Sequence, residues 1–275
     1  MTPKSKSEAG ERWAQKPPRR NPRHKRKNRD QAFENNWIYG HHAVRAALAN
    51  PVRRCRRLLV AAADGVDAAT IEAACEPQIV TPAEIEAVLP AGAVHQGIAL
   101  LADPLAQPDL AEICAAPAAD ALVLVLDQVT DPRNLGAVLR AAAGFSADAV
   151  IVQHRHGPQI TGAAAKAASG AAEIVPVVRA TNLARGLGQL AAAGFWRVGL
   201  DANAVADLAS VGPADGWGRT ALVLGAEGRG LRPLVARSCD ELARIPLTAK
   251  TQVVDSLNVA AAAAIALYEV RRGRA

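Results

Sequence analysis

Blocks of apolar residues alternate with polar turns along most of the chain, and the length of each block indicates a strand or a helix. A continuous apolar run at 122–126 is typical of a strand buried inside a parallel sheet, and a further strand is predicted at 149–153. Alanine-rich segments at 134–144 and 256–271 favour helices, because alanine has the highest helix propensity. This strand–helix alternation predicts an α/β fold whose mostly parallel sheet is covered on both faces.

A smaller α/β unit is predicted ahead of this one, and it begins near residue 36. Its strands are predicted at 37–40, 57–60, 78–80 and 97–101, and its helices at 41–49, 67–75 and 82–89. Further strands of the larger unit are predicted at 174–178, 196–200 and 221–224. Three prolines and one short helical segment after the small unit indicate a linker. We therefore expect four segments, namely a basic disordered tail at 1–33, a small domain at 34–103, the linker at 104–119 and a large domain at 120–275.

The formal charge of +6 is unevenly distributed along the chain. Residues 1–30 hold eleven Lys and Arg against three acidic residues, so the rest of the chain carries a small net negative charge. This segment is rich in proline and nearly free of aliphatic residues, so it cannot bury enough apolar surface to fold alone. It is either a solvated tail or a flexible arm that binds nucleic-acid phosphates, and we favour the arm.

Other features of the composition exclude several classes of protein. No apolar run approaches the roughly 20 residues of a membrane-spanning helix, and the N-terminus lacks the apolar core of a signal peptide. The four cysteines include no Cys-x-x-Cys pair, so neither a zinc site nor a disulfide framework is indicated. No dinucleotide fingerprint or phosphate loop occurs. We expect a cytoplasmic protein without a membrane segment or a bound metal.

The first segment that could carry chemistry is Asn-Leu-Gly-Ala-Val-Leu-Arg at 134–140. It follows the strand predicted at 122–126, and ligands of open α/β sheets lie beyond the carboxyl ends of strands. Asn134 is suited to cap the helix that begins there. Arg140, nearly two turns further and among small and apolar residues, needs an anion or another acceptor. An internal salt bridge is the alternative.

Two later segments follow predicted strands in the same way. Leu-Gly-Ala-Glu-Gly-Arg-Gly-Leu at 224–231 has glycines that permit close backbone approach. Ile-Pro-Leu at 245–247 precedes Ser-Leu-Asn-Val at 256–259, where the last helix is predicted to begin. Ser256 is suited to cap that helix, whereas Asn258 in its first turn is unexpected because asparagine is a poor helix former. Each segment alone is a weak signal.

Together, and in this order, the three segments resemble the motifs of the SpoU branch of the SPOUT RNA 2′-O-ribose methyltransferases. The resemblance covers roughly 36–273. Trp-Ile-Tyr-Gly-His-His-Ala-Val at 37–44 and His-Gln-Gly-Ile at 95–98 resemble the bacterial two-domain type that acts on a guanosine of 23S rRNA. The resemblance implies a C-terminal trefoil-knotted SPOUT methyltransferase domain and a smaller, ribosomal-protein-like N-terminal α/β domain that binds RNA. It also implies a homodimer through the knotted domain, with the active site near the interface.

The resemblance further implies a chemistry and a set of residues. A methyl group passes from S-adenosylmethionine (SAM) to a ribose 2′-hydroxyl, with no metal. The implied cofactor contacts are Leu224, Gly225, Ile245, Leu247 and Leu257. The implied catalytic positions are Arg140, Asn134, Glu227, Ser256 and Asn258. A guanidinium stays protonated above about pH 12, so clamping the target phosphate or lowering the pKa of the hydroxyl is at least as plausible for Arg140 as a role as base.

The substrate that we expect is a guanosine of 23S rRNA. The alternatives are the same chemistry on tRNA, a non-catalytic knotted protein that binds RNA or assists ribosome assembly, and a small-molecule α/β enzyme. Two departures from the rRNA enzyme's usual pattern leave the RNA target open: the stretch from 247 to 256 is longer, and Ala260 replaces a common serine. Four arginines form a basic cluster that is either a solvated face or a phosphate-binding patch, namely Arg53, Arg54, Arg56 and Arg57.

Overall fold

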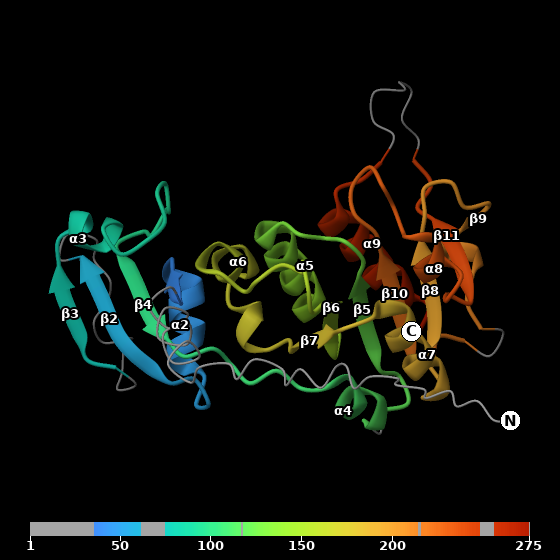
Figure 1. Cartoon of the computed structure of the whole chain (residues 1–275), viewed down its shortest axis with the longest axis horizontal. Helices are drawn as coiled ribbons and strands as arrows, with labels where there is room; N and C mark the ends of the chain where they lie inside the picture. The colour runs from blue at the N-terminus through green and yellow to red at the C-terminus, as the bar shows by residue number, and fades with distance from the viewer. Residues whose placement is uncertain (1–35, 62–74, 117, 214–215, 248–255, 275) are drawn as a thin grey trace, which may run out of the picture.

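The chain forms two α/β units that lie end to end along the long axis of the molecule (Figure 1). The computed structural model describes residues 36–61, 75–116, 118–213, 216–247 and 256–274. No helix in these ranges is long and apolar enough to cross a bilayer. The predicted tail at 1–33, most of the predicted helix at 67–75 and residues 248–255, between the last two motif stretches, lie outside the described residues. The knot therefore stays a prediction.

The N-terminal unit is a small mixed sheet with helices packed against it. Its strand order is β1-β4-β2-β3, in which β4 runs antiparallel to both neighbours and β2 pairs with β3 in parallel. The strands are β1 (Trp37–Tyr39), β2 (Cys55–Ala61), β3 (Pro77–Val80) and β4 (Ile98–Ala102). The helices are α2 (His41–Ala49) and α3 (Pro82–Glu86). Thr81 and Glu84 close a capping box at the start of α3, which fixes where that helix begins.

The C-terminal unit contains a seven-stranded sheet in which every pair of neighbours is parallel, as the apolar runs predict. The strand order is β7-β6-β5-β10-β8-β11-β9. The strands are β5 (Leu122–Leu126), β6 (Ala149–Gln153), β7 (Val177–Ala180), β8 (Trp196–Leu200), β9 (Ala206–Asp207), β10 (Thr220–Leu224) and β11 (Glu241–Arg244). The helices are α4 (Leu110–Ala115), which falls in the segment predicted as a linker, α5 (Pro132–Gly144), α6 (Gly162–Ala168), α7 (Leu183–Ala192), α8 (Pro233–Ala236) and α9 (Val259–Arg272). Two short 3-10 helices complete the unit, η2 (Ala171–Glu173) and η3 (Leu208–Ser210).

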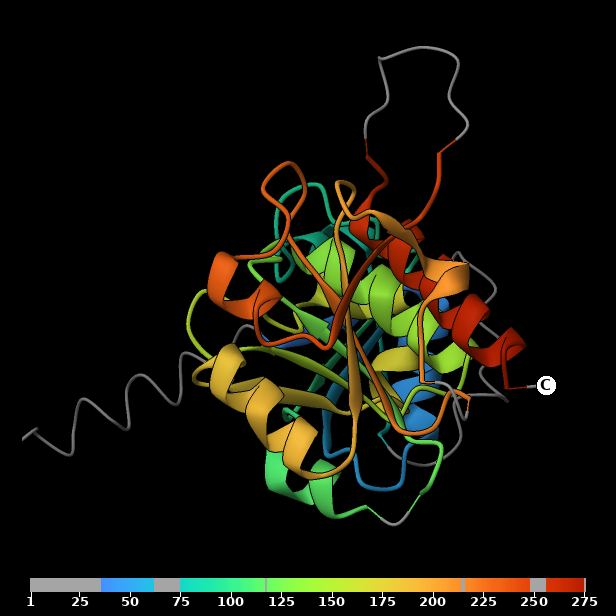
Figure 2. The ribbon, with the colours of Figure 1, turned by 90° about the vertical axis from the view of Figure 1, so that its right-hand side faces the viewer.

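Both faces of this sheet are covered by helices, as Figure 2 shows. Successive strand residues point to opposite faces, so Leu124 of β5 packs in a core with α5 and α9. Its neighbour Val125 packs in a second core with α7 and α8. This two-sided burial explains why β5 is apolar at every position.

Two predicted helix caps are wrong. Helix α5 begins at Pro132 and is capped by the side chain of Asp131, not by Asn134. Helix α9 begins at Val259 and is capped by Asn258, not by Ser256. Ser, Asp and Asn all accept the bonds that a helix start leaves open, so the residue type alone does not locate the cap. The strand predicted at 174–178 is also displaced, because β7 begins only at Val177.

The arginine cluster in the small unit is neither a uniform solvated face nor a continuous phosphate patch. Arg53 forms an ion pair with Glu173 of η2 in the other unit, and each side chain is only 5% exposed. Its Nε donates to Glu173 at 3.0 Å, and Asn50 Nδ2 donates to the same carboxylate oxygen at 2.9 Å. Arg56 stays exposed and pairs with Asp103 of its own unit. Arg53 therefore joins the two units.

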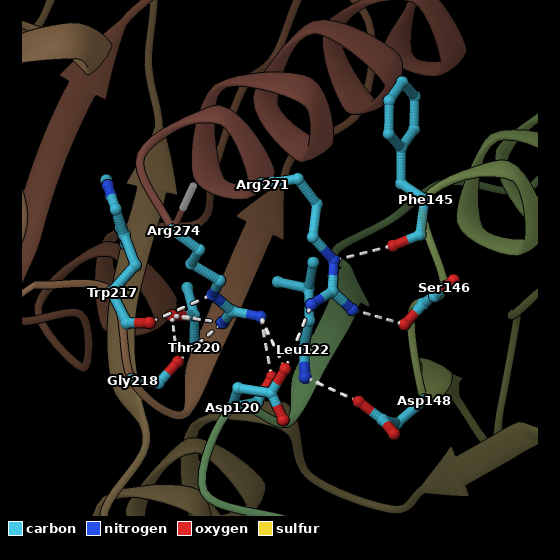
Figure 3. A network of polar contacts seen from close by, with 10 residues as sticks. All are labelled: Asp120, Leu122, Phe145, Ser146, Asp148, Trp217, Gly218, Thr220, Arg271 and Arg274. Carbon is cyan, nitrogen blue, oxygen red and sulfur yellow. Dashed lines mark hydrogen bonds and ion pairs between the residues drawn. The ribbon is translucent and has the colours of Figure 1, made fainter.

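The end of α9 is fastened to the edge of the large sheet by the two arginines in Figure 3. Arg271 Nε donates to the carbonyl of Phe145 at 2.8 Å. Arg274 Nη1 donates to the carbonyl of Asp120 at 2.6 Å, and its Nε donates to that of Trp217 at 3.0 Å. Arg271 in the last turn of α9 and Arg274 just beyond the helix thus bind three separate loops. These bonds fix the end of α9, and so they help to place its start at the opposite edge of the sheet.

Candidate functional site

The three motif segments meet at the carboxyl edge of the large sheet. Strands β5 and β10 are adjacent and end in register, at Leu126 and Leu224. The segments that follow them therefore leave the sheet side by side. The N-terminus of α9 arrives at the same edge, where side chains of all three segments form hydrogen bonds with one another.

Asn134, Glu227 and Asn258 form one hydrogen-bonded cluster. Asn258 Nδ2 donates to Asn134 Oδ1 at 3.0 Å and to Glu227 Oε1 at 2.8 Å, and Asn134 Nδ2 donates to the same Oε1 at 3.1 Å. Asn258 Oδ1 accepts from the backbone of Ala260 as the cap of α9, which leaves its amide nitrogen for the cluster. An amide offers both donors and an acceptor, and a carboxylate only acceptors. The pattern thus orients the carboxylate of Glu227.

Loop 225–231 is folded tightly on itself, and its glycines permit this. A Cβ added at Gly225 would lie 2.1 Å from the carbonyl carbon of Gly230, so no side chain fits there. Gly230 N donates to Ala226 O at 2.9 Å. Gly228 and Gly230 both have positive φ, which glycine adopts without a steric penalty. Glu227 is exposed at the tip of this loop.

A cavity of about 350 Å³ opens between this loop, the ends of β8 and β11, and the start of α9. All five predicted cofactor contacts line it, namely Leu224, Gly225, Ile245, Leu247 and Leu257. Glu227 and Ser256 line it as well. Its size, and the mixture of apolar side chains with a few polar groups, suit a small organic ligand.

Sequence reasoning missed some polar residues of this cavity. Asp201 and Asn203 line it from the loop after β8, and Arg229 lines it from the glycine-rich loop. Asp201 Oδ1 accepts from the backbone of Asn203 at 2.8 Å, which shapes that turn. The signal was available, because Asp201 directly follows the strand predicted at 196–200 and so falls at the carboxyl edge.

Arg140 is placed apart from the cavity. It lies six residues beyond Asn134 on α5, which is about 9 Å along the helix axis and on another face. It is exposed, and among the described residues it has no hydrogen-bond or ion-pair partner, so the internal salt bridge considered above does not form. The structure thus brings Asn134, Glu227 and Asn258 together and places Ser256 in the cavity wall. Within a single chain, Arg140 belongs neither to this cluster nor to the cavity wall.

Comparisons with known proteins match both units. The family described as SpoU rRNA Methylase matches residues 121–268, and the family described as RNA 2′-O ribose methyltransferase substrate binding matches residues 37–108. An uncharacterized tRNA/rRNA methyltransferase of Mycolicibacterium gilvum is 41% identical over 187 residues, which span 67% of this chain but only 58% of that relative. The 23S rRNA (guanosine-2′-O-)-methyltransferase RlmB of Photobacterium profundum is 39% identical, across 88% of this chain and 99% of its own length. The solved structure of an AdoMet-bound rRNA methyltransferase from Sinorhizobium meliloti is 25% identical, with 90% of each chain covered and a TM-score of 0.70.

Proposed function

We infer the reaction of this chain from one premise: the chain belongs to the SpoU rRNA methylase family, whose match covers residues 121–268. The chain is an RNA 2′-O-methyltransferase that uses SAM as the methyl donor. The observation that carries this proposal is the convergence of the three motif segments at one edge of the sheet. There they build the Asn134–Glu227–Asn258 cluster beside a cavity that holds every predicted cofactor contact.

The residues of the cavity fit SAM. Leu224, Ile245 and Leu257 supply apolar surface for an aromatic base, and Asp201 and Ser256 supply polar groups for hydroxyl and amino groups. The backbone of the glycine-rich loop faces the same space, and the absence of a side chain at position 225 keeps the loop closed on itself. When bound, SAM supplies an electrophilic methyl carbon on a sulfonium.

The proposed role of the cluster is to orient the ribose. A 2′-hydroxyl must give up its proton as its oxygen forms the new bond to carbon. Two amides hold Glu227 by Oε1, and Oε2 accepts no hydrogen bond from the described residues. Oε2 is therefore available to accept a hydrogen bond from the 2′-hydroxyl and to fix its direction. Such positioning supplies a large part of the rate in a displacement reaction.

A homodimer explains the position of Arg140. Helices α5 and α9 pack together, and α9 leaves two large apolar side chains exposed. Ile265 is 41% exposed and Tyr268 54% exposed, and the ring of Tyr268 meets Phe145 edge-on. We propose that a second copy covers this face and that Arg140 acts at the partner's cavity. Its guanidinium, which stays protonated, clamps the phosphate of the target nucleotide or lowers the pKa of the hydroxyl.

The proposed substrate is a guanosine of 23S rRNA, bound through the small N-terminal unit. The RlmB relative supports this choice because its match extends over 99% of its length, small unit included. A tRNA is the second candidate, because the M. gilvum relative carries both RNA types in its name. A cytoplasmic location is proposed with either substrate, and the four free cysteines fit a reducing compartment.

The test is methyl transfer from labelled SAM to undermodified 23S rRNA and to bulk tRNA, offered separately, with mapping of the labelled nucleotide. We expect label at a ribose 2′-oxygen of 23S rRNA. Label in tRNA would keep the reaction and replace the substrate. Absence of both label and SAM binding by calorimetry would favour the non-catalytic alternative.

The variant Arg140→Ala tests the assignment of the site. It is expected to abolish transfer while SAM affinity and the fold stay unchanged, because Arg140 does not line the cavity. Arg185→Ala is the matched control, since Arg185 is an exposed arginine on α7, across the sheet. An active Arg140→Ala enzyme, or one that has lost SAM binding, would contradict the proposed role.

A further inference from the structure

The two ends of the glycine-rich loop are joined by one buried residue, Asp127. Asp127 is the first residue after β5, and its side chain is 0% exposed. Its backbone N–H donates to the carbonyl of Leu224, the residue before loop 225–231, at 2.8 Å. Its carboxylate accepts from the backbone N–H of Arg232, the residue after the loop, at 2.9 Å, and from Arg232 Nε at 2.8 Å.

The side chain of Arg232 extends this connection to a third strand. Its Nη2 lies 2.7 Å from Asp127 Oδ1, the oxygen that Nε also contacts, while Oδ2 accepts from the backbone N–H of Arg232. Gln153, at the end of β6, accepts from the same Nη2 at 2.6 Å when its amide oxygen faces the guanidinium. A carboxylate removed from water must be paired, whereas the arginine side chain is 40% exposed and stays hydrated. The pair therefore links the ends of β5, β6 and β10.

We propose that Asp127 and Arg232 are positioning residues for methyl transfer. Neither lines the cavity, so they act through the loop between them. By setting the separation of its two ends, they place Gly225 and Glu227 against the cavity. A loop so rich in glycine has few side chains that could hold it by packing. This inference rests on the proposed function, because it concerns the same site, and the sequence alone singled out neither residue.

The chain contains a matched pair at the opposite edge of the same sheet. Arg197 donates to Asp240 from its backbone N–H at 2.8 Å and from its Nε at 2.9 Å, so backbone and side chain both engage one carboxylate. Arg197 lies near the start of β8 and Asp240 directly before β11, far from the carboxyl edge that holds the cavity. The side chains of this pair are 17% and 23% exposed. A variant that lacks this pair tests the effect of lost stability while loop 225–231 keeps its own contacts.

The experiment compares Asp127→Asn with Asp240→Asn in the full-length protein. Folding is checked by circular dichroism at the assay temperature, SAM affinity by calorimetry and RNA affinity by filter binding. We expect Asp127→Asn to raise the Kd for SAM at least tenfold in folded protein, with RNA affinity unchanged. Asp240→Asn is expected to lower the unfolding temperature and keep the Kd within twofold. A purely structural role of Asp127 would lower stability and leave the Kd unchanged.

A second variant keeps the proposal falsifiable if Asp127→Asn does not fold. Arg232→Lys keeps the positive charge but loses the planar fork that engages Asp127 and Gln153, so a tenfold rise in the Kd for SAM is expected here too. Wild-type affinity for SAM in folded Asp127→Asn or Arg232→Lys would overturn the inference and leave the methyltransferase assignment standing. A wild-type protein that binds no SAM would instead overturn the proposed function.

Discussion

Removing the charge of Glu173 is expected to loosen the joint between the two units. Glu173 and Arg53 are each 5% exposed, and Asn50 donates a further hydrogen bond to the carboxylate. The change Glu173→Gln keeps the shape of the side chain but turns an amide NH₂ group toward N–H donors. It also leaves a buried guanidinium without a counter-charge. Breaking one partner of a buried ion pair costs about 3–5 kcal/mol.

This cost can be measured as a change in thermal unfolding. For a chain of this size, 1 kcal/mol corresponds to about 2–4 °C, so the expected fall in unfolding temperature is about 6–20 °C. Because the pair joins the units, calorimetry should also separate the unfolding of the small unit from that of the large one. Small-angle scattering should report a larger radius of gyration. The pair Arg56–Asp103, whose arginine is 56% exposed, offers the control, since solvent weakens it and Asp103→Asn should cost no more than about 1 kcal/mol at pH 7.

A double variant separates charge from packing. Replacing both Arg53 and Glu173 by methionine removes the buried charges together, so most of the lost stability should return. If Glu173→Gln unfolds at the wild-type temperature with wild-type scattering, the pair does not hold the units together and the reasoning is refuted. If the double variant is as unstable as Glu173→Gln, an uncompensated buried charge is not the cause of the loss.

Three further predictions address the loop, a thiol and the response to acid. Gly225→Ala should abolish SAM binding in calorimetry because its Cβ would collide with the loop backbone, whereas Gly188→Ala, with open space around it, should bind normally. Burial raises the pKa of the Cys239 thiol to about 12, so mass spectrometry after iodoacetamide at pH 8 should find it alkylated only in unfolded protein. A hydrogen bond from Arg56 lowers the pKa of Asp103, so the pair stabilises the fold above about pH 4. This contribution is lost as the pH falls through the lowered pKa. The variant Asp103→Asn should therefore show a smaller acid-induced fall in melting temperature than the wild type.

The elements that could be predicted are those whose signal is local. Strands β5, β6 and β8 lie at 122–126, 149–153 and 196–200 as predicted. Continuous apolar residues at 122–126 and 149–152 suit a sheet covered on both faces. The caps were misplaced because neighbouring polar residues suit a helix start equally well. At α5, Pro132 decides the choice in favour of Asp131, since proline fits the first turn of a helix.

The contacts that each arginine forms depend on partners distant in the sequence. Four arginines at 53–57 look alike as a local pattern, yet only Arg53 finds a buried carboxylate, 120 residues away. Asp127 and Arg232 likewise pair across 105 residues. No spacing rule connects such positions. The packing of α2, β2 and η2 brings Arg53 to Glu173, and the pairing of β5 with β10 brings Asp127 to Arg232.

The α/β pattern and the three motif segments could be predicted before folding was considered, since they depend on residue type and short spacing. Which polar side chains meet depends on how distant segments pack. Asn134, Glu227 and Asn258 are separated by 93, 31 and 124 positions, and they share hydrogen bonds because β5 and β10 end side by side while α9 begins above them. Hydrogen bonds require contact within about 3 Å, and contact between segments far apart in the chain is set by how the sheet and its helices pack.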